Sequence, residues 1–286
     1  MKTSVSLFIG AVGLIALTTS ACAGKKTDGG PITLTGGSAP TGGGTAAGGA
    51  PAAGGGDGTG SSAATGNTIT IDGVWVDGTG NTVGIQGAFF VLEDGVKDGA
   101  ALTDGLPHSD FTADVDPLED AGVSKFSDTS TVCISGTAAK VMAADGTTEC
   151  GFNSGDEACN FDSTWGGGIG LNLNESGGDA SVKSTYDATS HGITGFKFNL
   201  TGDVGGATVR FKAVPTGATT DFCNTITTMV PGDVTVNLAD ILSECWSTGG
   251  LPVPLDALES LQWQIVTDNK DAHTVSNFCV NSLEWF

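Results

Sequence analysis

Apolar and polar residues alternate with a period of two in several short runs of this chain. Successive side chains of a β-strand point to opposite faces of a sheet, so such runs predict strands with one buried and one wet face. Gly, Asp, Asn and Pro between the runs are typical turn residues. The clearest runs carry their apolar residues at Ile169/Leu171/Leu173, Phe196/Phe198/Leu200, Val209/Phe211/Ala213, Leu261/Trp263/Ile265 and Phe278/Val280.

Two further runs, Gly84 to Leu92 and Thr131 to Val141, are also strand candidates. Only the stretch around Leu238 to Leu242 looks helical, for one or two turns. Trp263, Phe196, Phe198 and Phe211 are expected in the core. The patterning therefore predicts an all-β domain over residues 67–286, a two-sheet antiparallel β-sandwich of the size that one hydrophobic core can support.

The first 22 residues are typical of an export signal. A basic start precedes about thirteen mostly apolar residues from Val5 to Leu17, too few to span a bilayer. Thr19-Ser20-Ala21-Cys22 resembles a bacterial lipobox, which implies lipidation of Cys22; an ordinary signal peptide cut after Ala23 is the alternative. Either route exports the chain, as an outer-membrane or cell-surface lipoprotein or as a secreted protein, with the membrane reached only through the lipid.

Residues 23–66 are expected to form a disordered linker. Of the 40 residues in 27–66, 36 are Gly, Ala, Ser, Thr or Pro. Such a segment lacks the apolar area to offset its chain entropy. A flexible linker of this length reaches about 35 Å root-mean-square, enough to hold a domain clear of a membrane surface.

The charge of the chain excludes nucleic acid as a partner. Residues 67–286 hold eight basic and 30 acidic residues, a net charge of −22, and Arg210 is the only arginine. Phosphate backbones are bound by basic stripes, which this domain lacks.

Six cysteines remain once Cys22 is assigned to the lipid. An even number in an exported domain predicts three disulfides, although many connectivities are open in principle. We favour Cys150–Cys159, which closes a short loop, and Cys223–Cys245, which ties a strand to the short helical segment. Cys133–Cys279 is then left to join an early strand to the last one. No C-x-x-C spacing suggests a zinc site.

Five segments in order carry a resemblance to a known family. They are Trp165 to Asn174 (WGGGIGLNLN), Tyr186-Asp187-Ala188, Gly192 to Phe198 (GITGFKF), Leu261 to Ile265 (LQWQI) and Asn277 to Val280 (NFCV). This set resembles the galactose-binding-domain-like jelly rolls of carbohydrate-binding modules and secreted bacterial surface proteins. The resemblance covers most of residues 83–286. It implies a two-sheet sandwich that often binds glycan on one sheet face and sometimes holds a structural calcium.

The outward positions of the predicted strands supply candidate sugar ligands. Hydroxyl groups need paired donors and acceptors, and the CH faces of sugars stack on aromatic rings. Arg210 is suited to anchoring hydroxyls or a uronate, while Trp165, Tyr186 and Trp246 near strand ends are candidate platforms. The ligand-binding set is Asn172, Arg210, Lys212, Gln262, Gln264, Trp165 and Tyr186. Pairing of Arg210 and Lys212 with acids of the sheet is the alternative role for these two cations.

Calcium would find oxygen ligands at Glu93 and Asp94, although no EF-hand spacing is present. Neither H-E-x-x-H nor G-x-S-x-G occurs, and nothing singles out a pair of carboxylates for glycoside hydrolysis. We therefore expect a non-catalytic protein that binds a polysaccharide or surface glycan. The alternatives are an adhesion or structural surface lipoprotein without a sugar site and, less favoured, a carbohydrate-active enzyme, because one fold serves many functions.

Overall fold

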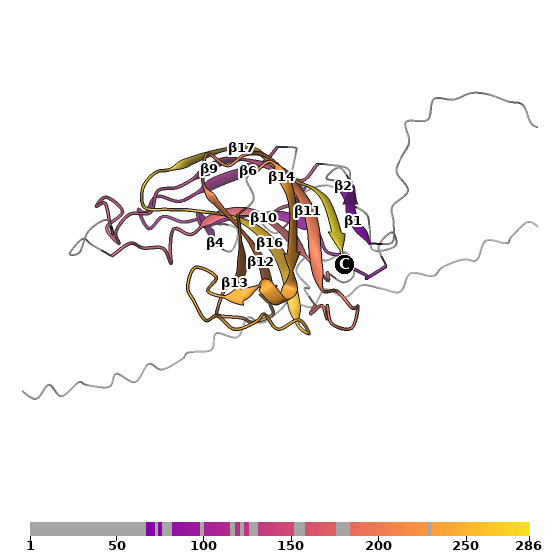
Figure 1. The fold of residues 1–286 in the computed structure, drawn as a ribbon. Coiled ribbons are helices and arrows are strands. Elements are labelled where there is room, and N and C mark those ends of the chain that lie inside the picture. Colours follow the sequence, from indigo (N-terminus) through magenta and orange to yellow (C-terminus); the bar gives the residue numbers. More distant parts are fainter. Residues whose placement is uncertain are drawn as a thin grey trace, which may run out of the picture. The chain divides into compact units, whose positions relative to one another are not determined.

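A computed structural model describes residues 67–71, 74–75, 82–97, 100–114, 118–120, 123–125, 131–151, 158–175, 184–227 and 230–286. The predicted signal segment, Cys22 and the linker lie outside these residues. Within them, two antiparallel sheets pack against each other (Figure 1), and the main hydrophobic core lies between them. The predicted two-sheet antiparallel β-sandwich is confirmed.

The first sheet, sheet A, has seven described strands. Its central strand is β17, which pairs with β11 along one edge and with β1 and β9 along the other; β14, β2 and β6 extend the sheet beyond them. The first described strand thus adjoins the last, as expected for a jelly roll. The strands are β1 (Thr68–Ile71), β2 (Val74–Trp75), β6 (Asp110–Ala113), β9 (Cys133–Ala138), β11 (Gly195–Asp203), β14 (Gly232–Asn237) and β17 (His273–Trp285).

The second sheet, sheet B, has eight described strands in the order β15-β13-β12-β16-β10-β3-β8-β7. The strands β4 (Val96–Lys97) and β5 (Ala100–Ala101) form a separate small hairpin. The strands of sheet B are β3 (Phe89–Glu93), β7 (Leu118–Asp120), β8 (Val123–Lys125), β10 (Gly166–Asn172), β12 (Thr208–Pro215), β13 (Phe222–Ile226), β15 (Leu242–Ser243) and β16 (Leu258–Val266).

The expected helical stretch is a single 3-10 turn, η1 (Leu238–Asp240), between β14 and β15. Leu238 is its buried residue, and the backbone N–H of Leu238 donates to the carbonyl oxygen of Thr194, so the turn is held by local contacts and not by a long amphipathic face. No helix among the described residues is long and apolar enough to cross a membrane.

Aromatic rings fill the centre of the sandwich. Trp263 lies 5.4 Å from Phe211 within sheet B and meets Phe198 of sheet A edge-on at 5.5 Å. Phe196 lies 6.0 Å from Phe211, and all four side chains are buried, which confirms their expected place in the core. Burying each ring contributes about 2–3 kcal/mol, so this cluster is a principal attachment between the two sheets.

Glycines in β10 let rings approach both faces of that strand. A Cβ at Gly170 would lie 2.2 Å from the ring of Phe90, and one at Gly167 would lie 2.6 Å from the ring of Phe111. Glycine has no side chain to obstruct such contacts. The glycine-rich run that begins at Gly166 therefore serves close packing over the strand.

The three predicted disulfides are all present: Cys133–Cys279, Cys150–Cys159 and Cys223–Cys245. Cys133 and Cys279 lie opposite each other on β9 and β17 of sheet A. Disulfides persist in oxidising compartments, so the three cross-links are consistent with an oxidising, extracellular environment.

Candidate ligand-binding pocket

The predicted polar residues lie in two cross-strand rows on the outer face of sheet B. Arg210 on β12 pairs with Gln264 on β16, and Lys212 pairs with Gln262 in the next row. Their chain neighbours, such as Trp263, face the core, so these four side chains point away from it. The rows place a guanidinium and an amide side by side, as the alternation predicts.

Pointing outward does not leave all of these side chains in water. Gln264, Lys212 and Asn172 are buried, contrary to the expectation of a wet face. Gln264 and Lys212 are bonded to residues that lie outside the regular strands of sheet B, namely Trp165 and Asp221. The alternation predicts which face of the sheet a side chain points to, whereas the exposure of that side chain to solvent depends on the loops that cover the sheet.

The covering segments enclose a pocket of about 500 Å³. Three predicted ligand residues line it, namely Arg210, Gln264 and Trp165, together with Trp246, which the sequence also suggests as a platform. The complete lining is Phe161, Asp162, Trp165, Arg210, Asp221, Trp246, Gln264, Val266 and Thr267. The volume is within the range of small-molecule sites, about 300–1,000 Å³.

Arg210 lies between the sheet and an indole ring. Its guanidinium carbon is 4.9 Å from the ring centroid of Trp246, a cation–π contact. Its Nε is shielded from solvent and has no hydrogen-bond partner in the part of the chain that the structure describes. Burial lowers the pKa of Arg210, and the nearby charge of Asp221 partly opposes that shift. The guanidinium remains protonated, because arginine titrates far above neutral pH, and its charge is partly desolvated.

Two neighbours of Arg210 have structural partners. The Nζ of Lys212 lies 2.6 Å from Oδ1 of Asp221, which favours the alternative of a structural ion pair for this lysine. The amide nitrogen of Gln264 donates to the carbonyl oxygen of Trp165 over 2.9 Å. Gln264 thereby holds the backbone that carries Trp165 in the pocket wall.

The aromatic rim projects from segments tied down by disulfides. Trp246 directly follows Cys245, which is bonded to Cys223 on β13. Phe161 follows Cys159 by two residues. Trp246 is 54% exposed and Phe161 is 47% exposed, so neither ring is held by deep burial. The disulfides supply an attachment that apolar packing does not.

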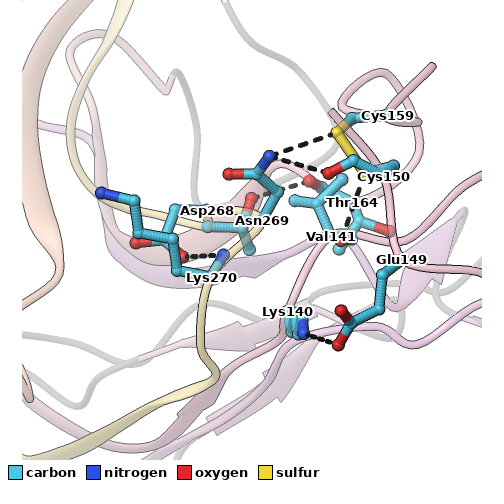
Figure 2. The surroundings of a disulfide bond; sticks show 10 residues. Lys140, Val141, Glu149, Cys150, Cys159, Thr164, Asp268, Asn269 and Lys270 are labelled. Carbon is cyan, nitrogen blue, oxygen red and sulfur yellow. Dashed lines mark hydrogen bonds and ion pairs between the residues drawn. A yellow bond between two sulfur atoms is a disulfide. The ribbon is translucent and has the colours of Figure 1, made fainter. Parts of the chain in front are cut away.

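Figure 2 shows how the Cys150–Cys159 disulfide is bonded to the segment that follows β16. Asn269, three residues beyond β16, donates from its side-chain nitrogen to the carbonyl oxygen of Cys150 at 3.0 Å and to Sγ of Cys159 at 3.6 Å. Nearby, the hydroxyl of Thr267 donates to the carbonyl oxygen of Thr164 over 2.7 Å. These bonds connect the end of β16 to the segment that carries Phe161 and Trp165.

Other predicted ligand residues lie outside the pocket. Asn172 donates to the carboxylate of Glu175, and Gln262 contacts Ser260 at 3.5 Å. The hydroxyl of Tyr186 donates to the carbonyl oxygen of Val83 over 2.7 Å.

Tyr186 is therefore a core residue and not an exposed platform. Its side chain is buried within the main hydrophobic cluster, and its ring stacks on His191 at 5.1 Å. Burial raises the pKa of its hydroxyl well above the usual value.

The suggested calcium ligands, Glu93 and Asp94, accept hydrogen bonds from backbone amides. The carboxylate of Asp94 accepts hydrogen bonds from the backbone N–H groups of Ser109 and Gly166, both at 2.6 Å. That of Glu93 accepts one from the N–H of Phe111 at 2.8 Å. Burial raises the pKa of both carboxyls, although these bonds oppose the rise. Among the described residues, no group of three His, Cys, Asp or Glu side chains is placed to hold a metal ion. Calcium binding stays a prediction.

Sequence reasoning did not assign five of the lining residues to the glycan site: Phe161, Asp162, Asp221, Val266 and Thr267. Phe161, Asp162 and Asp221 belong to no alternating run. The signal that they share is closeness to cysteine, since all three lie within three residues of Cys159 or Cys223. Loops next to cysteines, as well as strand faces, therefore form the pocket wall, and cysteine positions could have indicated it.

Comparisons of the chain with models of protein families, with curated proteins and with solved structures give no match.

Proposed function

We propose that this chain is a surface-anchored lipoprotein whose β-sandwich binds glycans without catalysing a reaction. One observation carries the proposal: Trp165, Trp246 and Phe161 wall a pocket that also presents Arg210 and Gln264. Aromatic faces stack on the CH faces of sugars, and guanidinium and amide groups bond to hydroxyls. Such a mixture of apolar walls and few polar groups is typical of small-ligand sites.

The carboxylates of the pocket favour binding over catalysis. Glycoside hydrolysis uses two carboxylates, about 5–10 Å apart, on either side of the scissile bond. Of the two acids in the lining, Asp221 forms an ion pair with Lys212. Asp162 is then the single lining carboxylate without an ion-pair partner in the described residues.

The presentation of the domain rests on the first 66 residues. A lipid at Cys22 followed by the linker of residues 23–66 would hold the pocket away from the membrane, facing glycans in the surroundings. The disulfides of the domain agree with that location. The family resemblance to galactose-binding-domain-like jelly rolls supports the same function.

The first test is Trp246→Ala in the full chain, assayed on an array of plant, bacterial and host glycans. The bound glycan should lose about tenfold or more in affinity, because an aromatic residue in a binding pocket often dominates the binding energy. Affinity would be measured by titration calorimetry with the tightest array ligand.

Leu251→Ala is the matched control. Leu251 belongs to the same connection between β15 and β16, is 71% exposed and does not line the pocket. Its removal should leave the affinity unchanged. Binding to no glycan, with and without calcium, would overturn the proposal and favour the adhesion or structural alternative. Release of reducing ends would favour an enzyme.

A further inference from the structure

The positive charge of Arg210 is unusual in this domain. Basic residues are few among the 286 residues, and acids outnumber them by 32 to 11. Lys212, two residues along the same strand, has Asp221 at 2.6 Å. No carboxylate of the described residues forms an ion pair with Arg210, whose close partner is the neutral ring of Trp246. Asp221 lines the same pocket, but its carboxylate is paired with Lys212. A half-buried cation without a carboxylate of its own is costly, and a ligand anion would offset that cost.

The lining around Arg210 carries one further unpaired charge, that of Asp162. Its strand neighbours on the outer face of the sheet are Thr225 and Gln264, both neutral. Lys212 and Asp221 cancel each other, which leaves Asp162 as the one acid to balance Arg210 in the pocket lining. Asp162 is exposed and solvated, so its charge is screened more strongly than that of Arg210.

We propose that the pocket selects a sugar that bears a carboxylate, a uronate, whose carboxyl group pairs with the terminal nitrogens of Arg210. This inference rests on the proposed glycan-binding function and narrows its ligand class. A guanidinium matches a carboxylate in a fork-shaped arrangement, and such charged hydrogen bonds exceed neutral ones in strength. The aromatic walls then accommodate the apolar faces of the sugar ring.

The charge of the rest of the domain limits the type of uronate. With eight basic and 30 acidic residues over 67–286, the domain repels a densely charged polyanion at long range. The attraction at Arg210 acts over a short distance. A uronate at a chain end or as a sparse side group is therefore favoured over a continuous polyuronate.

The test is a glycan array in which each uronate-bearing glycan stands beside its carboxyl-reduced, neutral counterpart. The unmodified full chain should bind the uronate member of its best pair about tenfold more tightly, because one charged hydrogen-bonded contact is added. Calorimetric titration of that pair gives the ratio, and added salt should reduce it.

Two variants assign the preference to Arg210. Arg210→Gln should bring the affinity for the uronate down to that of its neutral counterpart, while Arg210→Lys should retain part of the preference. Lys197→Gln is the control, because it removes the same charge from an exposed site on sheet A. Thermal melting of each variant reports whether it is folded.

The outcomes separate this inference from the function on which it rests. Equal binding of both members, or tighter binding of the neutral one, would overturn the uronate assignment and leave glycan binding in place. A preference that persists in Arg210→Gln would overturn the role of Arg210. Failure to bind any member of any pair would overturn the uronate assignment, and failure to bind every glycan of the wider array as well would overturn the proposed function itself.

Discussion

The outer faces of the two sheets have the same alternating pattern but different surfaces. On sheet A, a shallow groove of about 450 Å³ is lined mainly by polar residues of β11, β14 and β17. The lining residue Asn199 is bonded on both sides: its side-chain nitrogen donates to Asp233 at 2.6 Å, and the side-chain nitrogen of Asn281 on β17 donates to its oxygen at 3.1 Å. On sheet B, Arg210 forms no ion pair with the described residues, and three aromatic side chains line the pocket around it.

The difference shows what turns a sheet face into a candidate site. The groove of sheet A lacks a tryptophan among its lining residues, whereas the pocket of sheet B has two. Those two come from segments flanking the strands and not from strand positions. Polar alternation is thus common to both faces, and the disulfide-tied segments distinguish them.

The largest expected effect on stability comes from the disulfide of sheet A. Replacing Cys133 and Cys279 together by Ala opens a link between residues 146 apart in sequence. The chain-entropy estimate predicts a loss of about 4–5 kcal/mol in the free energy of unfolding. Glycan affinity of the folded fraction should not change, because this link is remote from the pocket lining. Urea unfolding and calorimetric titration measure the two quantities, and a parallel loss of affinity would contradict the separation of the two faces.

Removal of the Cys223–Cys245 disulfide should lower stability less but should also lower glycan affinity. Its 22-residue separation predicts a smaller loss, about 3 kcal/mol, when both cysteines become Ala. Affinity should fall by about tenfold or more, since Trp246 loses its attachment beside Arg210. The same two measurements apply. Unchanged affinity would show that Trp246 needs no disulfide to stay in place.

The smallest expected effect is a pH dependence of the free energy of unfolding, which comes from His273. The ring nitrogens of His273, the first residue of β17, lie 2.9 Å from the carbonyl oxygen of Gly205 and 3.0 Å from the carboxylate of Asp268. Burial alone lowers the pKa of His273, but the hydrogen bonds to these two acceptors outweigh burial, so the net pKa lies above the usual value. Protonated His273 donates to both, so its stabilisation is complete below about pH 6.5 and is lost as pH rises through the folded-state pKa.

Urea unfolding between pH 6 and pH 8 would test this contribution, which we expect to be below about 1 kcal/mol because Asp268 is partly solvated. His273→Gln should flatten the dependence. Stability that rises with pH in the unmodified chain, and not in the variant, would reverse the assigned sign.

Much of the fold was accessible to sequence reasoning because it depends on local periodicity. The runs around Leu171, Phe198, Phe211 and Trp263 became β10, β11, β12 and β16, with the expected residues inward. The disulfides followed from counting cysteines and preferring short loops. Register and strand order did not follow, since they are set by contacts between residues distant in the chain.

Only part of the pocket could be predicted from the sequence. Arg210, Gln264 and Trp165 were identified because they combine a strand position or a strand end with suitable chemistry. Tyr186 has suitable chemistry too, yet its hydroxyl reaches Val83 across the core, which no local pattern reports.

The sequence by itself determined that this domain is a disulfide-linked, acidic β-sandwich with one arginine. It did so because strand alternation, cysteine number and charge are properties of residues and their near neighbours. Only the tertiary structure decided that Arg210 meets Trp246 in a pocket while Lys212 is matched by Asp221. Those contacts depend on where loops cross the sheet, and loop paths are set by long-range packing and cross-links.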